Sequence, residues 1–188
     1  MKRSSRLATV MLALLLSGCW WQGPVFYRPS PSSAAPLIPG LYDAIDKDGT
    51  TKRNRISRAA DGSFYSPDDK GNGGGMFFAP LPISGRDVWV VEIVGGEADR
   101  DGAIYGLLER QADGVATAQI LECEGSETLV TAAGGTVEGT RVKPGEARTL
   151  GSPICSFPDR AALERALTAY VRAHSVLQAG VTLKRIGD

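Results

Sequence analysis

The stretch Val88-Trp89-Val90-Val91-Glu92-Ile93-Val94 combines β-branched and aromatic residues with apolar side chains on both of its faces. In an extended chain, alternate side chains share a face, so Trp89, Val91 and Ile93 form one wholly apolar side. Glu92 interrupts the other side. A short run that is apolar on both faces is typical of a strand buried on both. We therefore expect residues 87–94 to form the central strand of a sheet.

Turn signals divide the sequence on either side of this run into short extended segments. Asp-Gly pairs stand at 48–49, 61–62, 101–102 and 113–114, and this dipeptide favours hairpins because both residues tolerate positive φ. The pattern predicts an antiparallel β-meander. Its expected strands are residues 41–46, 52–59, 63–66, 76–83, 87–94, 103–111 and 115–123.

The C-terminal third predicts one helix and a last strand. Ser156 is the expected helix cap, with Asp159 at the capping-box position. A buried stripe is predicted for Leu163, Ala166, Leu167, Tyr170 and Val171. The alternating segment 181–185 is a candidate strand to close the sheet, whereas residues 124–154 predict only one or two short strands.

These elements give a mainly β or α+β fold class. The chain is expected to form a small antiparallel barrel or a strongly curved sheet, with one C-terminal helix packed on it. An open α+β sheet is the alternative.

The first nineteen residues have the three parts of an export signal. Three basic residues, Lys2, Arg3 and Arg6, precede the apolar stretch 7–16, and small residues lead to Cys19. As a helix, ten apolar residues span only about 15 Å, roughly half of a bilayer's hydrocarbon core. The stretch therefore predicts a cleaved signal rather than a permanent membrane span.

The sequence Leu16-Ser17-Gly18-Cys19 resembles the lipobox of bacterial lipoproteins. The resemblance implies cleavage before Cys19 and a diacylglyceryl group on its sulfur, so that the membrane is a partner through this lipid. Trp20 follows, not the aspartate that retains lipoproteins in the inner membrane of enteric bacteria. We therefore expect a protein anchored in the cell envelope, with the outer membrane facing the periplasm favoured. An ordinary secretory signal with a chance cysteine is the alternative.

The expected organisation is a signal peptide at 1–18, a lipidated proline-rich tether at 19–40 and a single globular domain at 41–188. Five of residues 20–40 are proline, which favours an extended, polyproline-like chain over packing. The aromatic residues of this segment either lie at the membrane interface or cover the globular domain; they are Trp20, Trp21, Phe26 and Tyr27.

Charge and cysteine content restrict the partners. Removal of residues 1–18 takes three of the 21 basic residues and none of the 21 acidic ones, leaving a net charge of about −3. Without a basic run, nucleic acid is not an expected partner. In an oxidising envelope, Cys123 and Cys155 are expected to form a disulfide, and two buried free thiols are the alternative. The chain-entropy model gives this disulfide about 3.7 kcal/mol.

One motif resembles a calcium loop. Residues 97–104 match the first eight positions of an EF-hand, with oxygen ligands at positions 1, 3 and 5 and glycine at position 6. Position 12 is Leu108 instead of a bidentate glutamate, and Glu109 falls one residue late. A polar hairpin loop accounts better for the motif, and no metal or cofactor is predicted.

Candidate catalytic groups are few. His174 is the only histidine and is expected near the end of the helix, while Cys155 is assigned to the disulfide. Glu92, Glu109 and Glu122 are predicted on strands, where two of them would have to meet in a cleft for acid–base work. The sequence therefore predicts a protein that is not an enzyme.

The expected function is a non-catalytic binding or structural module with an unidentified partner in the envelope. A periplasmic inhibitor or a small-ligand carrier is the second hypothesis, since a lipid-anchored barrel with one disulfide is similar in shape to periplasmic lysozyme-inhibitor lipoproteins. A carrier's pocket would include Trp89 or Tyr105. A hydrolase that uses carboxylates is the third hypothesis.

Overall fold

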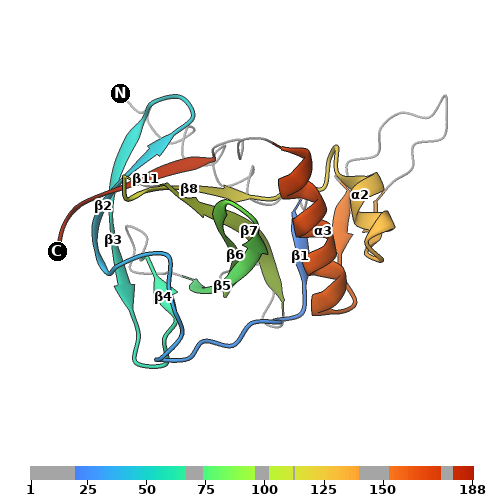
Figure 1. Cartoon of the computed structure of the whole chain (residues 1–188), viewed down its shortest axis with the longest axis horizontal. Helices are drawn as coiled ribbons and strands as arrows, with labels where there is room; N and C mark the ends of the chain where they lie inside the picture. The colour runs from blue at the N-terminus through green and yellow to red at the C-terminus, as the bar shows by residue number, and fades with distance from the viewer. Residues whose placement is uncertain (1–19, 67–73, 96–101, 112, 140–152, 175–179) are drawn as a thin grey trace, which may run out of the picture.

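Eight antiparallel strands close into a barrel in the computed structural model, which describes residues 20–66, 74–95, 102–111, 113–139, 153–174 and 180–188 (Figure 1). Each strand pairs with the next one along the chain from β2 to β8, and β11 pairs with both β8 and β2. The eight strands are β2 (Gly40–Asp46), β3 (Thr51–Arg58), β4 (Phe64–Tyr65), β5 (Gly75–Ile83), β6 (Arg86–Val94), β7 (Ala103–Arg110), β8 (Val115–Ile120) and β11 (Val181–Gly187).

The predicted meander is confirmed, and the choice between an open sheet and a barrel is decided by β11. Every predicted strand is present with bounds that differ by one or two residues, except that β8 ends at Ile120 instead of continuing to Cys123. Just beyond this end, the backbone N–H of Leu121 still donates to Tyr105 of β7, and the Leu121 carbonyl oxygen accepts the backbone N–H of Trp21 in another strand.

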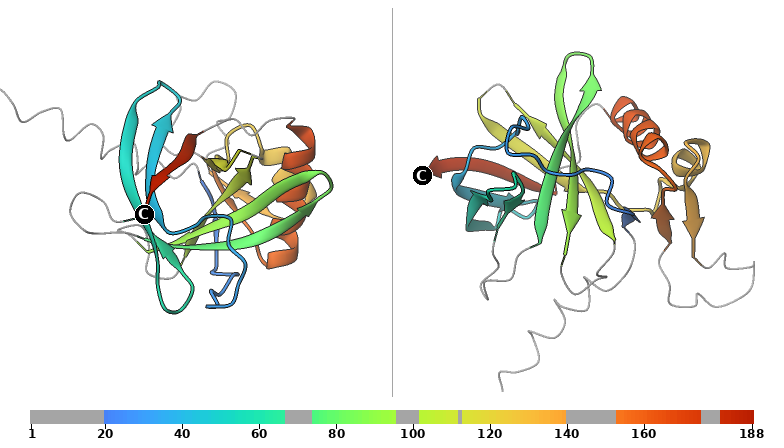
Figure 2. Two further views of the ribbon diagram at one scale, coloured as in Figure 1. Left: turned by 60° about the vertical axis from the view of Figure 1, so that its left-hand side comes forward. Right: turned by 90° about the horizontal axis from the view of Figure 1, so that it is seen from below.

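Three further strands and two helices form a side layer against the barrel (Figure 2). The strand β1 (Trp21–Gly23) pairs antiparallel with β7 and parallel with β10 (Ile154–Ser156), which pairs in turn with β9 (Thr136–Glu138). The helices are α2 (Glu127–Ala132) and α3 (Arg160–Ala173).

The helix α2 corrects the expectation that residues 124–154 hold only short strands. Six residues are too few to show a helical repeat in the sequence. The buried Val130 anchors this short helix to the core of the side layer. Of the same region, residues 140–152 lie outside the described part of the chain.

The predicted cap of the C-terminal helix is also corrected. Ser156 belongs to β10, and Asp159 is the N-cap, whose Oδ1 accepts the backbone N–H of Ala162 at 2.7 Å. The buried stripe of α3 is confirmed and includes Ala162, while Tyr170 is only half-buried.

The strand β6 separates two apolar cores, as its sequence predicts. Trp89 and Val91 pack inside the barrel with residues of five other strands, namely Tyr42, Ile56, Phe64, Leu108 and Ala116. Val88 and Val90 point outward and pack in a second core with α3. The two faces of one strand are therefore buried by different layers.

The segment 20–40 packs against the domain instead of forming a free tether. Trp21, Tyr27 and Leu37 are buried, so covering the domain is the correct alternative for Trp21 and Tyr27. Proline prevents regular pairing, but it does not prevent the apolar residues between prolines from packing. In Figure 1 the segment runs from β1 along the barrel to β2.

The turn between β3 and β4 is shaped to receive this segment. Gly62 has φ +95°, and a Cβ there would lie 2.3 Å from the carbonyl oxygen of Ser30. Only glycine satisfies both the turn and this close approach. Arg58 then donates to the carbonyl oxygens of Ser30, Pro31 and Ser33.

The predicted disulfide joins Cys123 and Cys155. Both residues are fully buried, and their Cα atoms lie 5.3 Å apart. The bond connects β10 to the chain that leaves the barrel after β8. It therefore fastens the side layer to the barrel wall next to β1.

Candidate functional site

The interior of the barrel is closed at one end by large side chains. Leu37, from the segment before β2, packs with Tyr42, Ile56 and Phe64, and each is less than 7 % exposed. The hydroxyl of Tyr42 donates to the carbonyl oxygen of Ile38 at 2.7 Å, which holds this segment in place. We call this the closed end.

The other side chains of the interior are apolar, and the described residues cover them incompletely. These side chains pack against the same core and remain half-buried; they are Met76, Phe78, Ile93, Ala118 and Leu183. They come from the beginnings of β5 and β11 and the ends of β6 and β8. This group adjoins the closed end at β4, where Met76 pairs with Phe64 and the rings of Phe64 and Phe78 lie 5.2 Å apart. We call these five residues the half-buried end.

Ile120 extends the apolar surface of the half-buried end. It is the last residue of β8, follows the same alternation as Ala116 and Ala118, and is 41 % exposed. Apolar side chains that are left partly in water at one end of a small barrel can be covered by an apolar ligand.

Trp89 and Tyr105, the two residues expected in a carrier's pocket, lie on opposite sides of the barrel wall. Trp89 faces the interior, and its indole N–H donates to Asp87 at 2.7 Å. Tyr105 faces outward into the second core. Only Trp89 is therefore available to the barrel interior.

Glu92 is fully buried on the outer wall and holds the N-terminal segment. One carboxylate oxygen accepts the backbone N–H of Phe26 at 2.7 Å, and both oxygens accept that of Tyr27 at 3.2 Å. Burial raises the pKa of Glu92, and these two N–H groups together with Arg160 act against that rise. Its lone pairs are engaged with the backbone, so Glu92 fixes the chain in position.

A polar cluster next to Glu92 completes this attachment. The hydroxyl of Tyr27 donates to Glu164 at 3.1 Å, and Arg160 pairs with the same carboxylate at 2.7 Å while lying over the Tyr27 ring. Burial, followed by the charge of Glu164, raises the pKa of the Tyr27 hydroxyl. Tyr105 donates to the carbonyl oxygen of Pro24, and burial followed by Glu92 raises its pKa.

Sequence reasoning missed this cluster. The available signal was a carboxylate inside an otherwise apolar strand, since a buried carboxylate requires donors. Nothing in the sequence indicates that those donors are the backbone of residues 26 and 27.

Glu109 forms an ion pair with Arg86, which in turn binds the C-terminal end of α3. Arg86 binds both carboxylate oxygens of Glu109, at 2.6 and 2.7 Å, and this pairing raises the pKa of Arg86. The same guanidinium donates to the carbonyl oxygens of Val171 and His174 at 2.8 and 3.1 Å. A cation at the C-terminus of a helix is favoured by the helix dipole, so the pair fastens α3 to the barrel.

The three candidate carboxylates do not come together. Glu92 and Glu109 lie on the same face of neighbouring strands, and their register places them four residues apart, or about 13 Å. Glu122 lies past the end of β8 and is exposed. No two of these side chains share a cleft in the described structure.

The side chain of His174 contacts Tyr170 at the end of α3. Its Nδ1 lies 2.7 Å from the carbonyl oxygen of Tyr170, and the two rings stack at 4.1 Å. Cys155, which a cysteine–histidine pair would need, is bonded to Cys123.

Most of the calcium-like motif, residues 97–101, lies outside the described part of the chain. Its twelfth position, Leu108, is 1 % exposed inside the barrel. Over the described ranges, no group of three His, Cys, Asp or Glu side chains is arranged to hold a metal ion.

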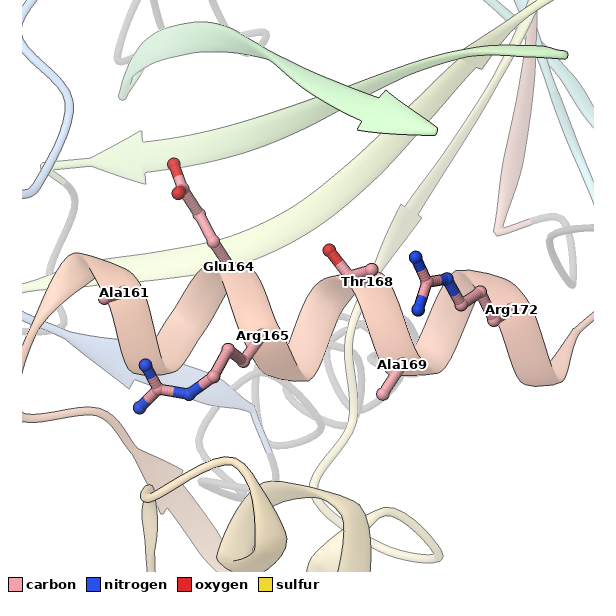
Figure 3. A pocket seen from close by; sticks show the side chains of 6 residues that line it. All are labelled: Ala161, Glu164, Arg165, Thr168, Ala169 and Arg172. Atoms are coloured by element: carbon pink, nitrogen blue, oxygen red, sulfur yellow. The ribbon is translucent and has the colours of Figure 1, made fainter. Parts of the chain in front are cut away.

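A hollow of about 430 Å³ lies on the exposed side of α3 (Figure 3). The described residues that line it are Ala161, Glu164, Arg165, Thr168, Ala169 and Arg172. In Figure 3 Arg165 points toward α2, away from Thr168 and Arg172, and its guanidinium donates to the carbonyl oxygen of Ala133. Because these polar groups diverge, the half-buried end of the barrel is the better candidate site.

Near the start of the described residues, Trp21 is the first side chain that is buried in the core. The indole is fully buried, and its N–H donates to the Ser126 hydroxyl at 2.9 Å and the Glu122 carbonyl oxygen at 3.0 Å. Its ring packs against Phe157, with centroids 5.1 Å apart. Cys19 and the rest of the lipobox lie outside the described residues.

No helix within the described ranges combines the length and the apolar character needed to cross a membrane. Comparison of the sequence with protein-family models and with curated proteins, and of the structure with solved structures, found no match.

Proposed function

We propose that this chain is a lipid-anchored protein of the bacterial cell envelope whose barrel binds an apolar ligand. The observation that carries the binding role is the asymmetry of the barrel interior. One end is sealed by Leu37, Tyr42 and Phe64, whereas the half-buried end leaves apolar side chains partly in water. The proposed role is non-catalytic binding.

Two properties of the barrel support a ligand carrier over an inhibitor. The ring is closed, so the interior wall is preorganised before a ligand arrives. The half-buried end is lined by Met76, Phe78 and other flexible or flat apolar groups, which adapt to the shape of a ligand.

Anchoring is supported by the lipobox-like sequence before Trp20 and by the disulfide, which suits an oxidising compartment. The favoured location is the outer membrane, with the barrel on the periplasmic side. Mass spectrometry of the mature protein should find acylated Cys19 as its first residue. An unmodified N-terminus further along the chain would refute the anchor.

Titration with a fluorescent fatty-acid analogue tests the binding role. The wild-type protein should bind the probe saturably. Ala118→Phe should weaken binding about tenfold or more, because the added ring occupies the space at the half-buried end. Leu183→Gln should weaken it without adding volume, by placing an amide against the ligand.

The matched control is Ala169→Phe, which adds the same ring on the exposed side of α3. It should leave binding unchanged. Absence of saturable binding to the wild-type protein, or equal affinity in Ala118→Phe, would exclude the barrel interior as the site.

A further inference from the structure

The N-terminal segment joins the folded domain close to the half-buried end. Trp20 forms a β-bridge with Glu122, and Glu122 follows Ile120 by two residues. Bridged residues lie about 5 Å apart, and two extended residues add at most about 7 Å. Trp20 therefore lies within about 12 Å of Ile120, which extends the apolar surface of the half-buried end.

This attachment is rigid from its first residues. Trp21 is paired with Cys155 in β10, and its backbone N–H donates to the carbonyl oxygen of Leu121 at 3.0 Å. The proposed lipid-bearing residue, Cys19, is only two residues before Trp21. Two residues reach at most about 7 Å, so no flexible spacer separates the lipid from the folded domain.

We propose that the half-buried end is turned toward the bilayer and that its ligand is an acyl chain of a membrane lipid. This inference rests on the proposed function, since it requires both the anchor on Cys19 and an apolar ligand in the barrel. It adds the class of ligand and the orientation of the domain.

An acyl chain suits both the position and the chemistry of this end. The surface of an acyl chain is wholly apolar, and so are the half-buried side chains that it would contact, among them Met76, Ile93 and Leu183. Long acyl chains are poorly soluble in water. A barrel held directly at the membrane surface, with Ile120 at its rim, can receive the chain without passing it through the solvent.

Photo-crosslinking in vesicles tests the inference on the full acylated protein. The vesicles contain phosphatidylethanolamine, phosphatidylglycerol and a phosphatidylcholine that carries a diazirine near the end of one acyl chain. After irradiation, peptide mass spectrometry should locate adducts on residues of the half-buried end. Ala118→Phe should remove these interior adducts while the protein stays bound to the vesicles.

A spacer variant tests the orientation. About ten Gly and Ser residues inserted between Cys19 and Trp20 add roughly 17 Å of reach and should lower the yield of interior adducts severalfold. The same insertion in the turn at Asp113-Gly114, between β7 and β8 at the closed end, should leave the yield unchanged.

The outcomes separate the two proposals. Adducts confined to Trp20 and the outer wall, or an equal yield in the spacer variant, would refute the orientation. If the soluble probe binds the barrel but the photoreactive lipid does not label it, the ligand is apolar but is not drawn from the bilayer. If the protein does not stay on the vesicles, the anchor is wrong and this inference fails with it.

Discussion

Replacing Trp21 by alanine should destabilise the whole domain, although Trp21 lies in a segment whose sequence predicts an extended proline-rich tether. The indole is 0 % exposed and packs between Phe157 and Tyr170. Its neighbour Trp20 is only half-buried. The pair therefore provides an internal comparison between two identical side chains.

The magnitude follows from burial. An indole buries roughly 200 Å², which at about 25 cal/mol per Å² corresponds to about 5 kcal/mol. Measured Trp→Ala substitutions in cores cost about 3–5 kcal/mol. Ser126 also donates to Glu122 at 2.8 Å, so neither partner of the indole N–H is stranded by its removal. We expect a loss of about 4 kcal/mol, and about 1 kcal/mol or less for Trp20→Ala.

Urea unfolding followed by far-ultraviolet circular dichroism measures both variants, because tryptophan fluorescence is changed by the substitutions themselves. The slope with urea should stay the same while the midpoint falls. For a domain of this size, 4 kcal/mol corresponds to a Tm lower by about 10 °C. Equal losses in the two variants, or a loss below about 1 kcal/mol for Trp21→Ala, would refute the assignment of β1 to the core.

Three further predictions concern the contacts that fasten the side layer. Burial raises the pKa of Glu92, so above pH 4.5 the folded protein retains a proton that the unfolded chain has lost, and the stability contributed at this position falls as the pH rises. Glu92→Gln should remove that decline, which urea titrations of both proteins between about pH 4 and pH 8 measure; an equal or steeper decline in the variant would contradict the prediction. Replacing both Cys123 and Cys155 by serine should cost about 3.7 kcal/mol in the free energy of unfolding, and no loss relative to the oxidised protein would show that the bond does not restrain the unfolded chain. Arg86→Ala should cost about 2 kcal/mol and increase amide hydrogen exchange in the last turn of α3, whereas exchange spread evenly over the domain would argue against a local role.

The barrel was largely predictable because its signals are local. Asp-Gly turns and period-two alternation mark consecutive strands, and consecutive strands of a meander pair with each other. The run 88–94 indicates burial on both faces, and the structure supplies a separate core for each. Asp159 was predicted to support the start of the C-terminal helix, and only the identity of the cap differed.

The side layer was not predictable because its determinants are non-local. The burial of Trp21 depends on Phe157 and Tyr170, and the donors to Glu92 come from a proline-rich stretch far away in the chain. The half-buried end likewise results from closure of the ring, since the alternation along one strand does not show which end of a barrel is covered. The pattern of a single sequence shows which residues are apolar, but it does not show which of them contact each other in the folded protein.

The position of β11 determines when the barrel is completed. Its two neighbours, β2 and β8, have no other partner along those edges, so each presents unpaired backbone groups until residues 181–187 arrive. Chain synthesis delivers these residues after all the other described strands. The final pairing is between distant parts of the sequence, which is slow for barrels. An early chain therefore exposes two sheet edges that can pair with other chains, and protection of these edges until β11 is made becomes a requirement of folding.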